Sequence, residues 1–394
     1  KKPKVRFKGY EDAWEQRKLG DVFKEYSEKN HIELPALTII QGGGTVKRED
    51  SDRNLMYDES NLSNYKMVRK DDFIVHLRSF EGGLEKSSLD GIISPAYHTF
   101  HSDVADSRFY YPYFRSHEFI KYKLVPHVYG IRDGRSIDID GMKTIEIPYT
   151  SLEEQRRIGD YLESLDHLIT LHQRECEQAK KYKKYMLQKM FPQNGSNVPE
   201  IRFSGFTYAW EQRKVSDLLV ERNDQAPMSD EYPLMAFIAN QGVAPKGERY
   251  DRSALVNDEV GKKYKRTEYG DFIYSSNNLE TGSIGLNKYG NACISPVYSI
   301  FKPTGVAGLD FLGRRFLRKD FINEMVKWRQ GVVYGQWKIH EADFLKIEVT
   351  VPSKEEQKKI GQYLDNLDDL ITLHQQKCEE LQKIKKFMLQ NMFV

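Results

Sequence analysis

The sequence predicts a mixed α/β (α+β) fold in which two similar domains are joined by two long helices that form an antiparallel coiled coil with pseudo-twofold symmetry. The first observation is a repeated block: Ser151 to Phe191 matches Ser353 to Phe393 at an offset of 202 residues, with 26 of 41 positions identical. The second is a shorter repeat, AWEQRK, at Ala13 to Lys18 and again at Ala209 to Lys214. The segments between the repeats differ, so one frame carries two different inserts.

Both long blocks have the apolar spacing of a coiled-coil helix. Seam residues alternate spacings of four and three along each block. The seams are Ile158, Leu162, Leu165, Ile169, His172, Cys176, Ala179, Lys183, Met186 and Met190, and Ile360, Leu364, Leu367, Ile371, His374, Cys378, Leu381, Lys385, Met388 and Met392. Each helix is expected to be about 57 Å long at about 1.5 Å per residue. Because the seams match, we expect the two helices to pair with each other.

Cap and turn residues mark the ends of these helices. Ser151 with Glu154, and Ser353 with Glu356, fit capping boxes. The first helix is expected to stop before Pro192, where turn residues begin a linker.

A histidine lies at the middle of each block, His172 in the first and His374 in the second. In an antiparallel pair with a pseudo-twofold axis, equivalent residues lie opposite each other only at the centre. We therefore expect these histidines to face each other at the coiled-coil midpoint. A polar layer that sets the helix register explains such a pair without catalysis.

The inserts, roughly residues 20–149 and 216–352, combine short apolar strands with turn signals. The expected strands begin at Leu37 (LTII), Asp72 (DFIV), Ile145 (IEIP), Ala236 (AFIA), Asp271 (DFIY) and Ile347 (IEVTVP). Short echoes recur in the same order in both inserts: Gln-Gly, Asp-Phe-Ile, Ser-Pro-x-Tyr and Tyr-Gly. The inserts therefore look like two versions of one α/β domain, and the segments that differ between them are expected to carry specificity.

The composition describes a folded protein with room for two domains. The chain has 394 residues, of which 30% are charged and 39% hydrophobic. No apolar run approaches the roughly 20 residues of a membrane span, and the start, KKPKVRFKGYEDAW, lacks the apolar core of a secretory signal. We expect a cytoplasmic protein that does not associate with membranes.

The cysteines and the net charge bear on whether the chain binds zinc or nucleic acid. Cys176, Cys293 and Cys378 form an odd set without a CxxC pair, which favours a reducing cytosol and no zinc site. A net charge of +2 does not exclude nucleic acid, because local patches matter more than the total. Basic clusters occur at residues 180–184 and 262–266, although a single cluster of this kind is more often a solvated face.

The sequence shows no catalytic or cofactor motif. GGGTVK at Gly42 and GGLEKS at Gly82 lack the spacing that wraps a phosphate. GxSxG, HExxH, and HxE with a following CxxC do not occur. Neither does the Asn-Pro-Pro-aromatic or Asp-Pro-Pro-aromatic tetrapeptide of amino-methyltransferases, and no glycine-rich turn for S-adenosylmethionine is evident. A binding protein is therefore favoured over an enzyme.

The repeated motifs resemble a known family. A W-E-Q-R-K-[LV]-x-D entry at Trp14 and Trp210 opens each insert, and the helix EEQxxIGxYLxxLDxLIxLHQxxCE follows it. This closely resembles the specificity (S) subunit of type I restriction-modification enzymes of staphylococci and other Firmicutes, over essentially the whole chain. The resemblance implies target recognition domains at 1–150 (entry segment 1–19) and 205–352, spacer helices at 151–191 and 353–394, and a linker at 192–204.

The resemblance also implies a function and partners. Each recognition domain would read one half of a split sequence in double-stranded DNA, and the coiled coil would space the two readers. Two modification subunits, carrying S-adenosylmethionine, would methylate adenine N6. Restriction subunits that use ATP and Mg would cut unmodified DNA. This chain itself would carry no cofactor, no metal and no catalytic residue.

Candidate DNA contacts follow elements that the two inserts share. Arg and Lys usually contact guanine, and Asn and Gln usually contact adenine. The candidates are Arg78, Ser79, Arg132 and Arg135 in the first insert, and Asn277, Asn278, Gln336, Trp337 and Lys338 in the second. A surface or turn role is the more common one for any single residue of this kind, and Arg78 is the strongest candidate.

Apolar residues outside the seam leave two interpretations open. Leu168, Leu171, Leu370 and Leu373 form either a docking stripe for the modification subunits or a wider coiled-coil core. The apolar helix ends, Met186 to Phe191 and Met388 to Phe393, are expected to dock against a recognition domain.

Two other classes of function also stay open. One is a methyltransferase or nuclease fused to recognition domains, which would require a cofactor motif. The other is a coiled-coil adaptor that does not bind DNA.

Overall fold

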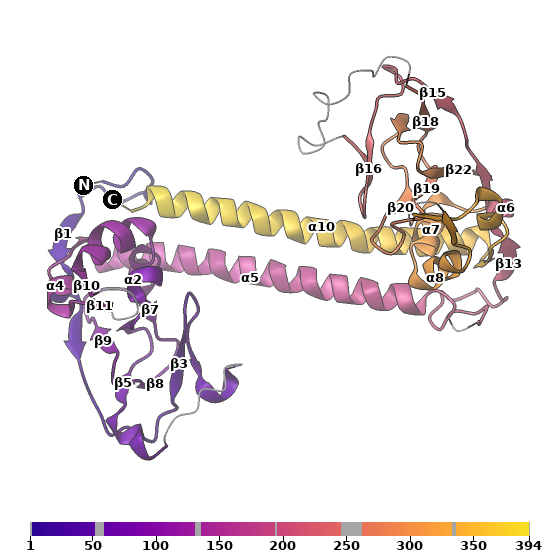
Figure 1. Cartoon of the computed structure of the whole chain (residues 1–394). Coiled ribbons are helices and arrows are strands. Elements are labelled where there is room, and N and C mark those ends of the chain that lie inside the picture. Colours follow the sequence, from indigo (N-terminus) through magenta and orange to yellow (C-terminus); the bar gives the residue numbers. More distant parts are fainter. Residues whose placement is uncertain are drawn as a thin grey trace. The chain divides into compact units, whose positions relative to one another are not determined.

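The computed structural model describes residues 2–51, 59–130, 135–193, 195–245, 262–332 and 336–393. The chain forms two compact units, unit 1 (Lys1–Glu175 and Leu373–Val394) and unit 2 (Cys176–Thr372). Each unit contains one insert together with part of each long helix (Figure 1). The sequence-based segments separate the helices from the inserts, whereas the compact units divide each helix near its middle.

The first insert, in unit 1, is built from short strands and short helices. They are β1 (Glu15–Lys18), α1 (Leu19–Val22), β2 (Lys24–Tyr26), β3 (Leu37–Ile40), β4 (Gly44–Lys47), β5 (Lys66–Val68), β6 (Phe73–Val75), α2 (Ser79–Gly82), β7 (Glu85–Lys86), β8 (Gly91–Ile93), β9 (His98–His101), α3 (Ser107–Phe114), β10 (Val128–Tyr129), β11 (Ser136–Ile137), α4 (Ile139–Lys143) and β12 (Glu146–Tyr149). Short 3-10 and π turns lie at Arg48–Asp50, Glu59–Asn64, Phe119–Leu124 and Val125–His127.

The second insert, in unit 2, has a similar series of elements. They are β13 (Glu211–Lys214), α6 (Val215–Leu218), β14 (Leu219–Glu221), β15 (Gln225–Ala226), β16 (Ala236–Ile238), β17 (Gly242–Ala244), β18 (Tyr264–Thr267), β19 (Phe272–Tyr274), β20 (Ile284–Leu286), β21 (Ala292–Ile294), β22 (Ser299–Pro303), α7 (Leu309–Phe316), α8 (Lys319–Lys327), β23 (Gln330–Val332), β24 (Gln336–Lys338), α9 (Glu341–Phe344) and β25 (Glu348–Val351).

The two inserts share one topology. The central sheet has the antiparallel order β2-β9-β6-β7 in unit 1 and β14-β22-β19-β20 in unit 2. In each unit the entry strand pairs with the last strand of the insert, β1 with β12 and β13 with β25. Each of the six expected strand segments contains a strand. The prediction of two versions of one α/β domain is confirmed.

One inner strand of each four-stranded sheet, β6 in unit 1 and β19 in unit 2, separates two apolar cores. In β6, Phe73 and Val75 pack into a large aromatic core, whereas Ile74 faces a smaller one. In β19, Phe272 and Tyr274 face the large core, and Ile273 faces the small one. Successive side chains of a strand point to opposite faces, so a fully apolar triplet is what a strand buried on both faces requires.

The long helices are α5 (Leu152–Lys189) and α10 (Lys354–Asn391), each of 38 residues. Contacts between them show antiparallel pairing within each unit, as predicted. In unit 1, Asp166 pairs with Lys385, and His172 lies next to His374. In unit 2, Lys183 pairs with Asp368, and the Tyr182 and Tyr363 hydroxyls are 2.9 Å apart. The two lysines therefore occupy seam positions as ion-paired rather than apolar residues.

The predicted capping boxes form only in part. The Ser151 and Ser353 hydroxyls accept the N–H groups of Glu154 and Glu356, each at 3.3 Å. The reciprocal bond of a capping box, in which the Glu154 carboxylate would accept the Ser151 N–H, does not form. The carboxylate instead accepts bonds from the Arg6 guanidinium at 2.6 and 2.8 Å. The Glu356 carboxylate is likewise taken by the arginine at position 202, at 2.7 Å for both bonds.

The residues that follow Glu154 and Glu356 in the repeated motif pack against a helix of each insert. Gln155 Oε1 accepts the N–H of Asp106, which caps α3, at 3.0 Å. A Cβ placed at Gly159 would lie 3.0 Å from the Cβ of Arg108 on α3, so glycine permits this close approach. Unit 2 repeats both contacts, because Gln357 accepts the Gly308 N–H at 2.8 Å and Gly361 lies against α7. The EEQxxIG motif is thus the contact surface that fixes each insert to its long helix, and we call this surface the socket.

The apolar helix ends dock as predicted. Phe393 lies against the rings of Trp14, Phe109 and Tyr113, with centroids 6.2, 5.0 and 5.9 Å away. Phe191 packs against Trp210 and Phe311 of unit 2, at 5.9 and 5.7 Å. Each insert therefore contacts the start of one long helix and the end of the other. Among the helices of the described residues, none combines the length and apolar character that crossing a membrane requires.

Candidate nucleic-acid interface

The first candidate loop, residues 76–83, follows the buried strand β6. The His76 N–H donates to the Ser79 hydroxyl at 2.9 Å. At the other end Gly83 has a φ of 85°, and a Cβ there would lie 2.3 Å from the Phe114 carbonyl oxygen. The loop is therefore held at both ends, and Leu77 and Arg78 are exposed between them. Ser79 itself is fully buried, so it belongs to the turn, and we do not propose it as a DNA contact.

A hairpin from far along the chain lies against this loop. Strands β10 and β11 pair Tyr129 with Ser136. The neighbouring Arg135 guanidinium stacks over the Phe80 ring at 4.4 Å and lies 3.4 Å from the Glu81 carboxylate. We define patch 1 as Leu77, Arg78, Glu81, Tyr129 and Arg135, all with exposed side chains. Arg132 lies outside the described residues.

Unit 2 has the same juxtaposition of loop and hairpin. The loop after β19 meets the hairpin β23–β24, because the Trp337 N–H donates to Asn277 Oδ1 at 2.6 Å. The Ile339 N–H donates to the Ser276 hydroxyl at 2.9 Å, which fixes the following turn. We define patch 2 as the predicted candidates of this unit, all of them exposed: Asn277, Asn278, Gln336, Trp337 and Lys338.

The two patches occupy equivalent places but differ in chemistry. Patch 1 presents arginine guanidinium groups, which suit the two acceptors on the major-groove edge of guanine. Patch 2 presents side-chain amides, which suit the donor and acceptor of adenine, together with an indole and an ammonium group. One topology therefore displays two different sets of hydrogen-bonding groups.

Ion pairs and burial set the charges at the patches. Arg329, beside patch 2, binds the Glu280 carboxylate at 2.7 Å through both terminal nitrogens, and this hydrogen bonding lowers the pKa of Glu280. Burial lowers the pKa of His76 at the start of the first loop, so its ring is neutral at pH 7. Lys338 is 3.6 Å from Glu341. An arginine held by a glutamate of the loop therefore lies within patch 1, as Arg135, and beside patch 2, as Arg329.

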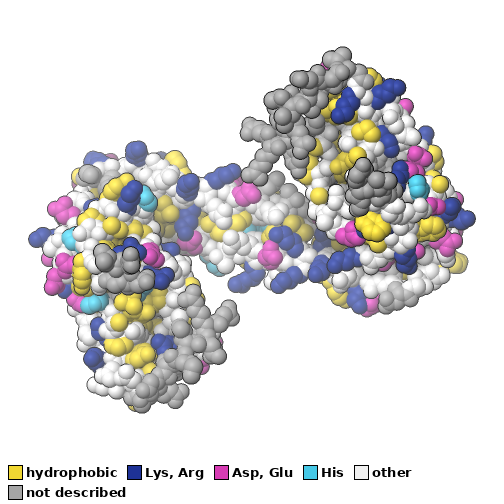
Figure 2. Space-filling view, viewed as in Figure 1, with side chains coloured by type: hydrophobic (Ala, Val, Ile, Leu, Met, Phe, Trp, Pro, Cys, Tyr) yellow, Lys and Arg dark blue, Asp and Glu magenta, His cyan; other side chains and the backbone are white. Residues whose placement is uncertain are grey.

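The basic clusters of the sequence are only partly on the surface. Lys265 is buried, and its ammonium donates to the Tyr298 carbonyl at 2.9 Å, with its pKa lowered by burial. Lys66 makes the equivalent bond to Tyr97 in unit 1, at 2.7 Å. On α5, Lys180, Lys181 and Lys184 are exposed, and Figure 2 shows Lys and Arg side chains along the visible face of the long helices.

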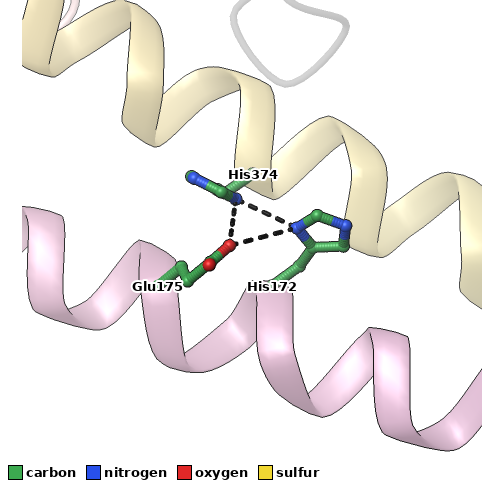
Figure 3. A group of neighbouring side chains, drawn as sticks. All are labelled: His172, Glu175 and His374. Carbon is green, nitrogen blue, oxygen red and sulfur yellow. Dashed lines mark hydrogen bonds and ion pairs between the residues drawn. The ribbon is translucent and has the colours of Figure 1, made fainter.

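The two predicted midpoint histidines lie side by side within unit 1. The Nδ1 atoms of His172 and His374 are 3.0 Å apart, so the predicted facing of the pair is confirmed (Figure 3). Glu175, one turn further along α5, points its carboxylate at both rings.

Several residues of structural importance were not predicted as site residues, although some of them carry a signal in the sequence. Arg6 and Arg202 begin an RF-x-G-aromatic segment that repeats at the same offset as AWEQRK. Glu81 lies near the candidate positions but has no motif of its own, whereas Tyr129 belongs to the Tyr-Gly echo that both inserts share. Glu175 could have been found from its place three residues after His172, on the same helix face.

Sequence comparisons find a family model and a relative that match this chain. The family model of the type I restriction modification DNA specificity domain matches residues 11–181 and again residues 210–383. A Methanocaldococcus jannaschii protein, described as the MjaX specificity subunit of a type I restriction enzyme, is 25% identical over 264 residues, which cover 64% of this chain. The aligned part spans 59% of the length of that relative.

Solved structures of similar architecture are also known. The type I restriction-modification S subunit from M. genitalium aligns over 100% of this chain and 99% of its own, with a TM-score of 0.57 and 16% identity. The HsdS subunit from Thermoanaerobacter tengcongensis covers 98% of both chains, with a TM-score of 0.49 and 17% identity. At these identities the first likeness supports the fold alone.

Proposed function

The chain belongs to the type I restriction modification DNA specificity domain family and contains two copies of that domain, and from this we propose that it selects the DNA sequence for a type I restriction-modification complex. Each insert is a target recognition domain, and each reads one half of a split site in double-stranded DNA. The coiled coil of α5 and α10 joins the two readers.

The observation that carries the proposal is the pair of equivalent but chemically different patches. Both patches lie where the loop after an inner strand, β6 or β19, meets a hairpin from later in the same insert. Their scaffolds have the same strand order, so the differences are concentrated in exposed side chains. Two readers of this kind account for a target with two unlike halves better than one continuous surface does.

The long helices suit a spacer. The two recognition domains must contact their half-sites at a defined separation and rotation about the duplex, because one turn of B-DNA spans about 34 Å. A helix of 38 residues is stiff, whereas a flexible linker would tolerate a broad range of gaps. The gap between the half-sites is therefore set by the helices that join the readers.

Exposed leucines support docking of partner subunits. Leu168 and Leu171 on α5, and Leu370 and Leu373 on α10, are between 37% and 51% exposed, so they do not form a wider coiled-coil core. They occupy identical positions of the two repeated blocks. We assign them to docking of two modification subunits, one on each copy, and restriction subunits join through the complex.

The chemistry belongs to the partners in this proposal. The modification subunits supply S-adenosylmethionine for adenine N6 methylation, and the restriction subunits supply ATP and Mg for cleavage. The complex acts in the cytoplasm, and this chain carries no catalytic group. A fused methyltransferase or nuclease would instead bind S-adenosylmethionine or a catalytic metal at its own motif, and an adaptor would not bind DNA.

The test is DNA binding by this chain with its modification subunits. We expect tight, specific binding to one split sequence, with affinity falling linearly on a logarithmic salt scale. The chain without partners is the control for partner-dependent binding. Binding of S-adenosylmethionine by the chain alone would favour the fused enzyme. An assembled complex that binds no DNA at any salt concentration would favour the adaptor.

A further inference from the structure

We propose that His172, Glu175 and His374 form a binding site for a transition-metal cation, of which Zn²⁺ is the representative, at the midpoint of the coiled coil. All three residues belong to unit 1. In the described part of the chain they form the one group of three His, Cys, Asp or Glu side chains close enough to share an ion. The cysteine pattern and the family resemblance predicted no metal site, and this proposal replaces that expectation.

The distances between the ligand atoms match one face of a tetrahedron around zinc. The two Nδ1 atoms are 3.0 Å apart, and Glu175 Oε2 lies 3.5 Å from His172 Nδ1 and 3.1 Å from His374 Nδ1 (Figure 3). Zinc bonds to nitrogen and oxygen are about 2.0–2.2 Å, which places tetrahedral ligands about 3.3 Å from one another. Three ligands therefore already have the required spacing, and a water molecule would complete the fourth position.

The donor types select the class of metal. Imidazole suits Zn, Cu, Ni and Fe, whereas Mg and Ca prefer sets of oxygen ligands. Two neutral imidazoles with one carboxylate form the same His₂Glu set that holds zinc in some hydrolases. Since all three side chains are partly exposed, an ion can reach the site from solvent.

The backbone fixes all three ligands. His172 and Glu175 lie three residues apart on α5 and so share one face of that helix, whereas His374 comes from α10. A bound ion would link two segments about 200 residues apart in sequence. Because it would bind the folded chain in preference to the unfolded one, it would stabilise unit 1.

The asymmetry of the repeat distinguishes this site from a simple polar layer. The repeat places histidine in both copies but glutamate in only one, because Lys377 stands where the second copy would have its carboxylate. Lys377 pairs with Glu380 at 2.8 Å. A layer that only set register would need the two histidines, whereas the carboxylate directed at both Nδ1 atoms is what a cation requires.

The experiment is metal titration of the full chain, without an affinity tag. Zn²⁺ binding is measured by competition with a chromogenic chelator, and Co²⁺ serves as a spectroscopic probe of four-coordinate geometry. We expect one tight site per chain and a higher melting temperature with Zn²⁺. Binding should weaken as pH falls, because the imidazoles must be neutral to bind metal.

Variants identify the ligands. Loss of even an outer partner of a metal ligand costs about 10–100-fold in affinity, so His172→Ala, His374→Ala and Glu175→Gln should each weaken binding at least tenfold. His167→Ala and Glu177→Gln, on the same helix and exposed, are the matched controls and should leave the affinity unchanged. Circular dichroism establishes that each variant keeps its helices.

Two results would overturn the proposal. One is a wild-type chain that shows no tight Zn²⁺ or Co²⁺ site. The other is a folded Glu175→Gln or His374→Ala protein that binds zinc with the affinity of the His167→Ala control.

Discussion

At the scale of single residues, Glu154 explains why a charged residue of the repeated motif is buried. It is fully buried, yet it accepts bonds from Arg6, from the Trp14 indole at 3.1 Å and from Thr150. Burial acts to raise its pKa, but the hydrogen bonds from Arg6 and Thr150 outweigh that effect and hold the pKa below 4.5. The carboxylate therefore ties the N-terminal segment to the start of α5.

Removing this charge should destabilise unit 1. Glu154→Gln leaves Arg6 without its counter-charge, and breaking a buried ion pair costs about 3–5 kcal/mol. We expect a loss near the lower limit, because the amide retains one acceptor. Denaturant unfolding measures it, and the exposed Glu153→Gln is the control, with an expected change within about 0.5 kcal/mol. Equal stability of both variants would show that the Arg6 pair is not structural.

The same Arg6–Glu154 ion pair predicts that the stability of the folded protein depends on pH. A carboxyl group whose folded pKa is depressed contributes stability above its unfolded pKa and loses it as pH falls through the folded pKa. The wild-type protein should therefore lose stability below about pH 4.5, and the Glu154→Gln protein should lose less over that interval. Parallel pH profiles of the two proteins would contradict the assignment.

Arg78 carries the sharpest prediction about DNA. Arg78→Ala should weaken binding by about 1–3 kcal/mol and relax one base of one half-site. Arg156→Ala, which removes an exposed arginine of α5 in the same unit, is the control and should leave the sequence preference intact. Selection from a random DNA library measures both outcomes. An unchanged motif in the Arg78→Ala complex would remove this residue from the reading surface.

Single residues were the least predictable from the sequence. Ser79 follows a shared strand as Arg78 does, but the chain turns at once and buries the hydroxyl against the His76 N–H. Arg78 and Arg135 are far apart in the sequence, and the contacts of Arg135 with Phe80 and Glu81 that bring it to the first loop depend on tertiary structure. The role of Arg6 also depends on a residue 148 positions away.

At the scale of elements, the long helices were predictable because their pattern is long and regular. A heptad seam specifies both the helix and the partner face over many turns, so it tolerates exceptions such as Lys183 and Lys385. The short strands of the inserts were found from apolar runs. Their pairing order could not be deduced from the sequence, because register in short strands depends on distant partners.

The helix length should set the gap between half-sites. Duplicating one heptad in both helices, residues 177–183 and 363–369, keeps the seams matched and adds about 10.5 Å, or about three base pairs of B-DNA. We expect a longer gap with both half-sites unchanged, measured by methylation mapping. Duplication in α5 alone is the control and should disrupt pairing. An unchanged gap in the matched variant would contradict the spacer role.

The docked helix end should contribute strongly to unit 2. Phe191 is fully buried against Trp210 and Phe311, and Phe→Ala at such sites costs about 3–5 kcal/mol. Phe387→Ala, on the exposed face of α10, should cost no more than about 0.5 kcal/mol. Hydrogen exchange should place the loss from Phe191→Ala in unit 2. A loss confined to unit 1 would contradict the observed packing.

At the scale of the whole molecule, the chain combines repetition and difference. The repeated helices, sockets and docking ends build the same frame twice, which suits two copies of one partner. The inserts keep one strand order and differ in the exposed groups of patches 1 and 2. This division was visible in the sequence as two repeats around unlike inserts. The bases that each patch prefers depend on side-chain geometry against DNA, which the sequence does not encode in any short motif.

The most direct test of the central claim is methylation mapping of DNA from cells that express this chain with its modification subunits. The proposed function predicts one motif with two unlike halves, a fixed gap and a methylated adenine in each half. A chimera that exchanges residues 205–352 for the recognition domain of a relative should change one half and preserve the other. A single continuous motif, or a chimera that changes both halves, would contradict the account of two independent readers on one frame.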